Sequence, residues 1–106
     1  MSVLLTVEAI FDVADIADYI DFSFGEDTSI RFRQRIQERF AKLDRYTHAD
    51  TGIRYRGNIV YRDVFAPSLI FFAIIENDVH VLRVLREERD WKRMLEEKQQ
   101  YSYPDE

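Results

Sequence analysis

An uninterrupted apolar run, LIFFAII at Leu69–Ile75, constrains the fold of this chain more than any other stretch. Turn-forming residues bound the run, with Ala66-Pro67-Ser68 before it and Asn77-Asp78 after it. Apolar runs of about four to eight residues between turn signals are typical of buried strands, whereas buried helices are longer. The run therefore predicts the central strand of a sheet.

The segments near the N-terminus predict a strand and two helices. Ser2–Thr6 is expected to be a short strand, and Thr6 is placed to cap a helix, because its side chain can accept a hydrogen bond from the first turn. Gly25 is expected to end this helix, since glycine is the usual left-handed terminator. Asp27 or Thr28 is expected to cap a second helix.

Both predicted helices carry an apolar stripe at the three-and-four spacing of an amphipathic helix. The stripe of the first helix consists of Ile10, Val13, Ala14, Ala17 and Ile20, and that of the second of Phe32, Ile36, Phe40 and Leu43. The linker between the helices is short, so they are expected to be antiparallel neighbours on one face of the sheet.

The segments around the apolar run predict the rest of the sheet. Tyr46–Gly52 is polar and is expected to be a loop, while Gly57-Asn58 between IRYR and IVYR is a hairpin signal. Ile59–Phe65 and Val79–Arg86 are expected to be the strands that flank the central strand.

The C-terminal part predicts one more helix. Asp90 is expected to cap a helix that ends near Gln99, and residues 101–106 are expected to form a flexible tail. The order of elements is then β-α-α-β-β-β-α. We therefore expect a single α+β domain over residues 1–106, an antiparallel sheet with a helical hairpin packed on one face.

Composition excludes several classes of protein. The formal net charge of −5 disfavours a general nucleic-acid binder, whose affinity depends on neutralising phosphates. The chain has no cysteine and only two histidines, so no disulfide, metal site or cofactor is expected. No apolar run approaches the roughly 20 residues of a membrane helix, and the N-terminus lacks the basic region of a signal peptide. We expect a cytoplasmic protein with no membrane partner.

The charges are divided unevenly along the chain. Residues 1–30 hold seven acidic and no basic residues, whereas residues 31–45 hold six basic and two acidic ones. One face of the first predicted helix carries Glu8, Asp12 and Asp15, and one face of the second carries Arg31, Arg35 and Arg39. The simpler interpretation is a seam of ion pairs along the hairpin; the alternative is an acidic platform for a basic partner.

The last predicted strand carries an arginine among apolar residues. By strict alternation, Leu82 and Val84 share one face, and Val81, Arg83 and Leu85 share the other. Because one helical hairpin covers only one face of a sheet, Arg83 is expected on the uncovered face. There its guanidinium would be solvated or would meet a partner.

Three stretches together resemble a known family. They are TVEAIFDVADIADYI followed by FGED, then VYRDVFAPSLIFFAI, and VHVLRVLREERDWKRML, where the LRVL strand followed by RDW is the most specific part. The chain resembles the RelE/ParE superfamily of type II toxin–antitoxin toxins, and its ParE-like branch most closely. The resemblance implies a β-α-α-β-β-β fold, bacterial growth arrest, plasmid stabilisation and neutralisation by a cognate antitoxin that wraps the toxin.

Two activities occur among such relatives: inhibition of DNA gyrase and ribosome-dependent cleavage of mRNA. Cleavage through a ribose 2′-hydroxyl needs a base, an acid and cations around the phosphate. The expected open face offers Arg62, Arg83 and Tyr61 for an endoribonuclease, but no lysine or histidine with a pKa suited to taking a proton. Gyrase is therefore the favoured target; mRNA cleavage on the ribosome, or an antitoxin-binding module without toxicity, are the alternatives.

Six residues near the end of the last strand are the candidates for contact with the antitoxin or the target: Val81, Arg83, Leu85, Arg86, Arg89 and Trp91. Arginine is suited to two-pronged contact with carboxylates of a partner. Trp91 is either an interface anchor or, with Met94 and Leu95, part of a stripe that docks the last helix on the sheet. The sequence leaves the oligomeric state open, both for homo-oligomers and for hetero-oligomers with the antitoxin.

Overall fold

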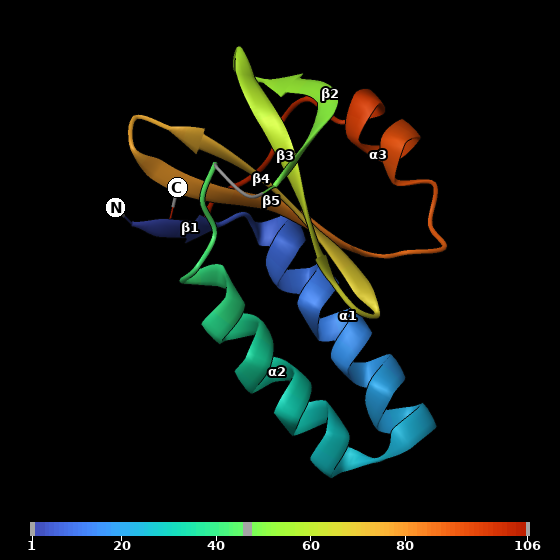
Figure 1. The fold of residues 1–106 in the computed structure, drawn as a ribbon. Helices are drawn as coiled ribbons and strands as arrows, with labels where there is room; N and C mark the ends of the chain where they lie inside the picture. The colour runs from blue at the N-terminus through green and yellow to red at the C-terminus, as the bar shows by residue number, and fades with distance from the viewer. Residues whose placement is uncertain (1, 46–47, 106) are drawn as a thin grey trace.

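The computed structural model describes residues 2–45 and 48–105, which form a five-stranded sheet and three helices (Figure 1). The elements in chain order are β1 (Val3–Leu5), α1 (Val7–Phe24), α2 (Glu26–Phe40), β2 (Ala49–Tyr55), β3 (Asn58–Phe65), β4 (Ser68–Ile75), β5 (Asp78–Arg86) and α3 (Trp91–Glu97). The predicted α+β class is confirmed. The structure adds β2, which pairs with β3 across the hairpin signal and occupies part of the predicted loop Tyr46–Gly52; the first two residues of that loop lie outside the described residues.

The strands lie in the order β1-β5-β4-β3-β2. β1 is parallel to β5, and the other neighbours are antiparallel, so β1 makes the expected antiparallel sheet a mixed one. β4 lies in the middle between β3 and β5, and every residue from Ser68 to Ile74 is buried. The apolar run therefore forms the central strand, as predicted.

A single glycine joins the two long helices. The side chain of Thr6 accepts a hydrogen bond from the Ala9 N–H at 3.0 Å and caps α1, as predicted. Gly25 ends α1 with a φ of 96°, which favours glycine, and it is also the residue that directly precedes α2. The predicted cap at Asp27 or Thr28 is wrong, because α2 has already begun at Glu26.

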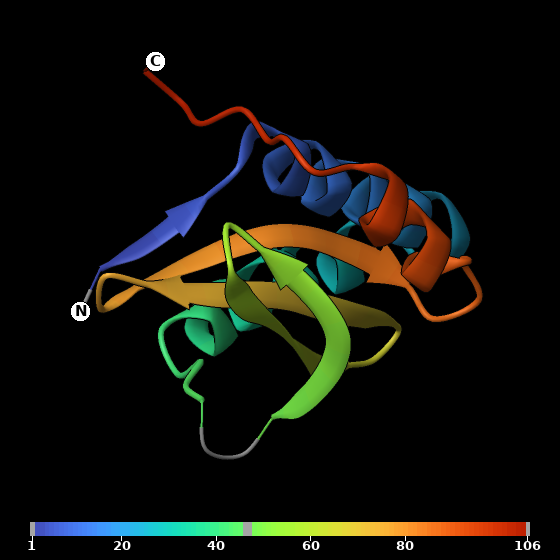
Figure 2. The same ribbon diagram turned by 90° about the horizontal axis from the view of Figure 1, so that it is seen from above.

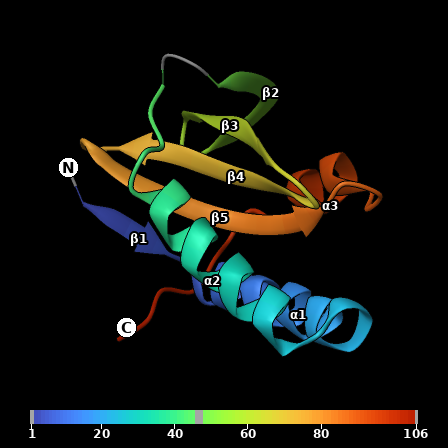
Figure 3. The same ribbon diagram turned by 60° about the horizontal axis from the view of Figure 1, so that its bottom comes forward.

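α1 and α2 lie side by side on one face of the sheet (Figure 3). The predicted stripe of the second helix is fully buried, whereas Ile10 of the first is 43% exposed and its place in the core is taken by Ala9 and Ile16. Ser29 also donates a hydrogen bond of 2.7 Å to the Ala17 carbonyl, which ties the start of α2 to the middle of α1.

The opposite face of the sheet is covered as well, so the expectation of an uncovered face is wrong. A second core lies there, formed by β2 to β5, α3 and the C-terminal segment, with Ile53, Tyr55, Val60, Leu69, Phe71, Ala73, Leu82, Leu85, Leu95 and Tyr101. α3 is shorter than predicted, ending at Glu97, and the Asp90 side chain makes no capping hydrogen bond. The helical hairpin therefore covers one face of the sheet, and α3 with the C-terminal segment covers the other.

A β-bulge in β5 changes which residues share a face. Phe71 lies opposite Arg83 and Phe72 lies opposite Val81, so Leu82 is an extra residue in β5. An extra residue shifts the alternation of the strand by one. Val81 and Val84 consequently pack toward the helical hairpin, while Leu82 and Leu85 pack toward α3. The predicted grouping of these residues was wrong for this reason.

The C-terminal segment is attached to the start of α1, contrary to the expectation of a flexible tail. The Val7 N–H donates to the Ser102 carbonyl at 2.8 Å, and the Ser102 N–H donates to Glu8 Oε1 at 3.1 Å. Figure 2 shows the segment crossing over the beginning of α1. These contacts hold the end of the chain beside β1.

Two tyrosines of this segment reach the sheet. Tyr101 is buried in the second core, and burial raises the pKa of its hydroxyl to about 12. The Tyr103 hydroxyl lies 2.8 Å from His80 Nδ1 and 3.2 Å from the Tyr55 hydroxyl. A neutral His80 can accept the Tyr103 hydrogen bond, which a protonated ring cannot.

The environment of His80 makes the stability of the fold depend on pH. Burial lowers the pKa of His80, and Arg56 lowers it further, against a weaker opposing effect of Asp78 and Glu76. The unfolded chain therefore binds this proton more readily, so stability rises with pH and is lost as pH falls below about 6.5. We expect the free energy of unfolding in urea to fall more steeply between pH 7 and about pH 5 in the wild type than in His80→Gln. Equal slopes in the two proteins would contradict this role of His80.

Candidate functional site

The arginine of β5 pairs with a carboxylate of its own chain. Arg83 Nε and Nη2 donate to the two carboxylate oxygens of Asp12 at 2.7 and 2.9 Å, and the Val84 N–H donates to Asp12 Oδ2 at 3.0 Å. The side chain of Arg83 is 16% exposed and that of Asp12 is 11% exposed. The hydrogen bonds from Arg83 to Asp12 raise the pKa of Arg83, although burial opposes them. The expected placement of Arg83 on an open face is wrong.

Thr6, which directly precedes α1, and Asp12 of α1 form hydrogen bonds with backbone groups at the outer edge of β5. β1 pairs with β5 only as far as Val81, so the following residues of β5 need other partners. The Thr6 N–H donates to the Val81 carbonyl at 3.1 Å, and its hydroxyl donates to the Leu82 carbonyl at 2.7 Å. Asp12 accepts from Val84 one step further along. Thr6 and α1 therefore provide hydrogen-bond partners for the backbone groups of β5 that β1 does not reach.

The predicted seam of ion pairs along the hairpin is absent from the described residues. Glu8 pairs with Lys98 at 3.3 Å, and Arg39 pairs with Asp63 of β3 at 3.3 Å. Burial raises the pKa of Glu8, but hydrogen bonds from its own and the Ser102 backbone and from Lys98 lower it overall. The charged side chains of the two helices thus pair with the C-terminal segment and the sheet.

The other predicted site residues divide between core and surface. Val81 is 0% and Leu85 is 2% exposed, and they lie in different cores. Arg86 lies over the ring of Tyr19, with 3.8 Å from Cζ to the ring centroid, and pairs with Glu88. Of the six candidates, Arg86 and Trp91 are partly exposed and Arg89 is exposed, and these three lie near the start of α3.

Trp91 docks the last helix on the sheet. Its ring lies 5.1 Å from that of Phe71, and the guanidinium carbon of Arg62, the cross-strand neighbour of Phe71, lies 5.5 Å from the Trp91 ring centroid. Arg89 is exposed and touches Met94 Sδ at 3.7 Å. Of the two interpretations of Trp91, these contacts favour the apolar stripe.

The three residues expected for an endoribonuclease are not brought together. Tyr61 stacks on Phe72 at 5.5 Å and belongs to the core under the helical hairpin. Arg62 points to α3 on the opposite face, and Arg83 is held by Asp12. A proton donor and two cations around one phosphate would have to share one face of the sheet.

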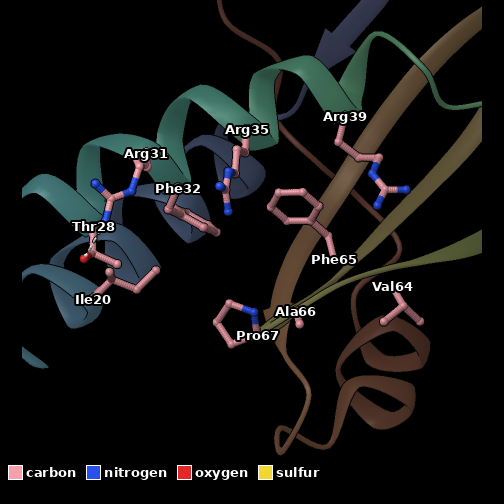
Figure 4. A pocket seen from close by; sticks show the side chains of 10 residues that line it. All are labelled: Ile20, Thr28, Arg31, Phe32, Arg35, Arg39, Val64, Phe65, Ala66 and Pro67. Carbon is pink, nitrogen blue, oxygen red and sulfur yellow. Dashed lines mark hydrogen bonds between the residues drawn. The ribbon is translucent and has the colours of Figure 1, made fainter. Parts of the chain in front are cut away.

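An open groove of about 500 Å³ lies between α2 and the turn that joins β3 to β4 (Figure 4). One wall consists of Arg31, Arg35 and Arg39, which follow one another at every fourth residue of α2. The facing wall and the floor are mainly apolar, with Phe32, Phe65, Ala66 and Pro67. The arginine stripe is visible in the sequence, but the opposite wall comes from a turn more than twenty residues further along the chain, so spacing alone could not reveal the groove.

The three arginines of the groove differ in how firmly they are held. Arg39 donates to Asp63 and lies over the Phe65 ring, with 5.3 Å from Cζ to the centroid. Arg31 donates to the Thr28 hydroxyl at 3.3 Å. Arg35 forms no hydrogen bond or ion pair with another described residue. The middle of the groove therefore presents an uncompensated cation.

Clusters of metal-ligand residues and helices that could cross a membrane are both absent from the part of the chain that the structure describes. It contains no group of three or more His, Cys, Asp or Glu that could hold a metal ion. None of its helices combines the length and the apolar character needed to cross a bilayer.

Comparisons with known proteins give one family and one fold. The family model for the ParE toxin of the type II toxin–antitoxin system, parDE, matches residues 3–91. None of the curated proteins matches the sequence. A solved structure described as the chromosomal ParDE TA system from P. aeruginosa contains a similar chain, with a TM-score of 0.67 and 23% identity over 83% of this chain and 97% of that one. At this identity, the structural likeness shows a shared fold.

The Asp12 contacts predict a large loss of stability on substitution. Asp12→Ala should lower the free energy of unfolding by about 3 kcal/mol, because it leaves a buried guanidinium and the Val84 N–H without a partner. Asp15→Ala, an exposed carboxylate on the next turn of α1, is the control and should change it by less than about 0.5 kcal/mol. Urea denaturation measures both. Similar losses in the two variants would show that the Arg83 pair contributes little.

Proposed function

The chain belongs to the ParE family of toxins of type II toxin–antitoxin systems, and from this premise we propose that it arrests bacterial growth by binding DNA gyrase. The family match over residues 3–91 is the observation that carries the proposal. We further propose that a cognate antitoxin binds and neutralises it, and that it acts in the cytoplasm, where gyrase and its DNA are found.

The arrangement of the candidate residues supports action by binding over cleavage of mRNA. Tyr61 and Arg62 lie on opposite faces of the sheet, and Arg83 is committed to Asp12. A ribonuclease would need a group able to take a proton close to cations that hold the phosphate. A protein that inhibits its target by contact needs only a complementary surface.

The surface near the start of α3 is a candidate for contact with the target. Arg86 is the last residue of β5, and Arg89, which is exposed, follows it before α3 begins. A guanidinium there can form charge-assisted hydrogen bonds with carboxylates of another protein. Val81 and Leu85 lie inside the two cores, where no partner reaches them in this conformation.

The presence of an antitoxin is supported by the family and by the structural relative. The family description names a toxin–antitoxin system, and the similar chain comes from a ParDE system. A segment that is disordered when free and folds on binding can cover a large toxin surface, although ordering it lowers the affinity gained per area.

Regulated expression in a bacterium that lacks the antitoxin tests the proposed function. We expect growth arrest, loss of supercoiling when the purified protein is added to gyrase, and intact mRNA in a cell-free translation system. Cleaved mRNA with normal gyrase activity would contradict gyrase inhibition and favour a ribonuclease. Normal growth, with gyrase unaffected, would favour an antitoxin-binding module without toxicity.

Charge reversal at the surface near α3 tests where the target binds. Arg89→Glu should raise the protein concentration needed for half-inhibition of gyrase about tenfold, which corresponds to roughly 1.4 kcal/mol of binding free energy. Arg33→Glu, the same charge reversal at an exposed residue of α2 on the other face of the sheet, is the matched control and should change it little. Inhibition that is equally strong in all three proteins would place the gyrase contact elsewhere.

A further inference from the structure

The groove beside α2 has a regular row of cations. Arg31, Arg35 and Arg39 are separated by four residues each, so their attachment points advance by about 6 Å per step along the helix axis. In Figure 4 the side chains of Arg31 and Arg35 extend from α2 toward the groove, and Arg39 lies beside Phe65. Carboxylates at every fourth residue of another α-helix have the same spacing.

The opposite side of the groove favours an apolar ligand surface. The rings of Phe32 and Phe65 lie 6.2 Å apart, and Ala66 and Pro67 are exposed beside them. Arg39 is already shared with Asp63, so the cations exceed the acid available to them within the groove. A ligand that fills the groove must therefore be acidic along one side and apolar along the next.

A protein helix meets this requirement better than a nucleic acid does. The chain carries a net charge of −5, and α1, which lies next to α2, has five acidic and no basic residues. A phosphate backbone that extends past the groove would meet this negative field. An amphipathic helix can place its acidic residues on the arginines and its apolar stripe on the Phe65–Pro67 wall.

We propose that the groove between α2 and the β3–β4 turn binds an acidic amphipathic helix of a partner protein. If the proposed function holds, the antitoxin is the protein that carries this helix; only this identification rests on the proposed function. Arg35 is the central contact, because it has no partner among the described residues and lies between the other two arginines. Two-pronged pairing of arginine with carboxylate sets the register of the bound helix.

A designed peptide can test the groove without knowledge of the natural partner. The probe is a fluorescein-labelled helical peptide of about 15 residues, a length near the minimum for a stable helix in water. It has glutamate at every fourth position and leucine on the adjacent face. The control peptide has lysine in place of each glutamate. Fluorescence anisotropy with the full-length protein should detect binding of the acidic peptide alone, and added salt should weaken it.

Matched substitutions on α2 locate the binding. Arg35→Glu should weaken the acidic peptide at least tenfold, and Arg31→Glu provides a second variant if the first folds poorly. Arg33→Glu makes the same charge change on the same helix outside the groove and should alter the affinity less than about twofold. Equal weakening by Arg35→Glu and Arg33→Glu would overturn the groove as the site.

Other occupants of the groove give different results. A single-stranded DNA that displaces the acidic peptide from the wild type would overturn the proposal in favour of a nucleic acid. A dimer in sedimentation analysis that Arg35→Glu dissociates would assign the groove to a second copy of this chain. Growth arrest without peptide binding would refute helix binding in the groove and leave the proposed function intact. Peptide binding without growth arrest would support helix binding in the groove and contradict the proposed function.

Discussion

Asp12 of α1 accepts three hydrogen bonds from β5, two from the guanidinium of Arg83 and one from the backbone N–H of Val84. The rest of the fold depends on this contact, because β1 is too short to cover the outer edge of β5. An unpaired backbone N–H and a largely buried guanidinium without a partner are both unfavourable, and one carboxylate satisfies them together. The same contact sets how α1, and with it α2, lies against the sheet.

Local patterns in the sequence were enough to predict the central strand, the apolar stripe of α2 and the cap at Thr6. Each of these depends on residues that are neighbours in the chain. The bulge at Leu82 and the attachment of Ser102 to Glu8 depend on contacts between distant segments, which spacing cannot indicate. Strict alternation therefore placed Arg83 on an open face, although its carboxylate partner lies 71 residues earlier in the chain.

The arginines of this protein consequently have two kinds of role. Arg83 stabilises the fold through Asp12, and Arg62 packs on Trp91 under α3. Arg35 in the groove and Arg89 near α3 remain exposed. Under the proposed function, these two separate surfaces would allow an antitoxin and a target to be recognised by different parts of one small domain. Their chemistry is similar, but the apolar wall beside Arg35 distinguishes the groove.

The pairing of Asp12 with β5 can be measured in solution by amide hydrogen exchange at Val84. Val84 lies beyond the residues that β1 covers, so its N–H exchanges slowly only if Asp12 accepts it. We predict protection of the Val84 amide close to that of the central strand β4. Exchange at Val84 as fast as at the exposed residues of β2 would contradict the account, since Arg83 would then be free for a partner.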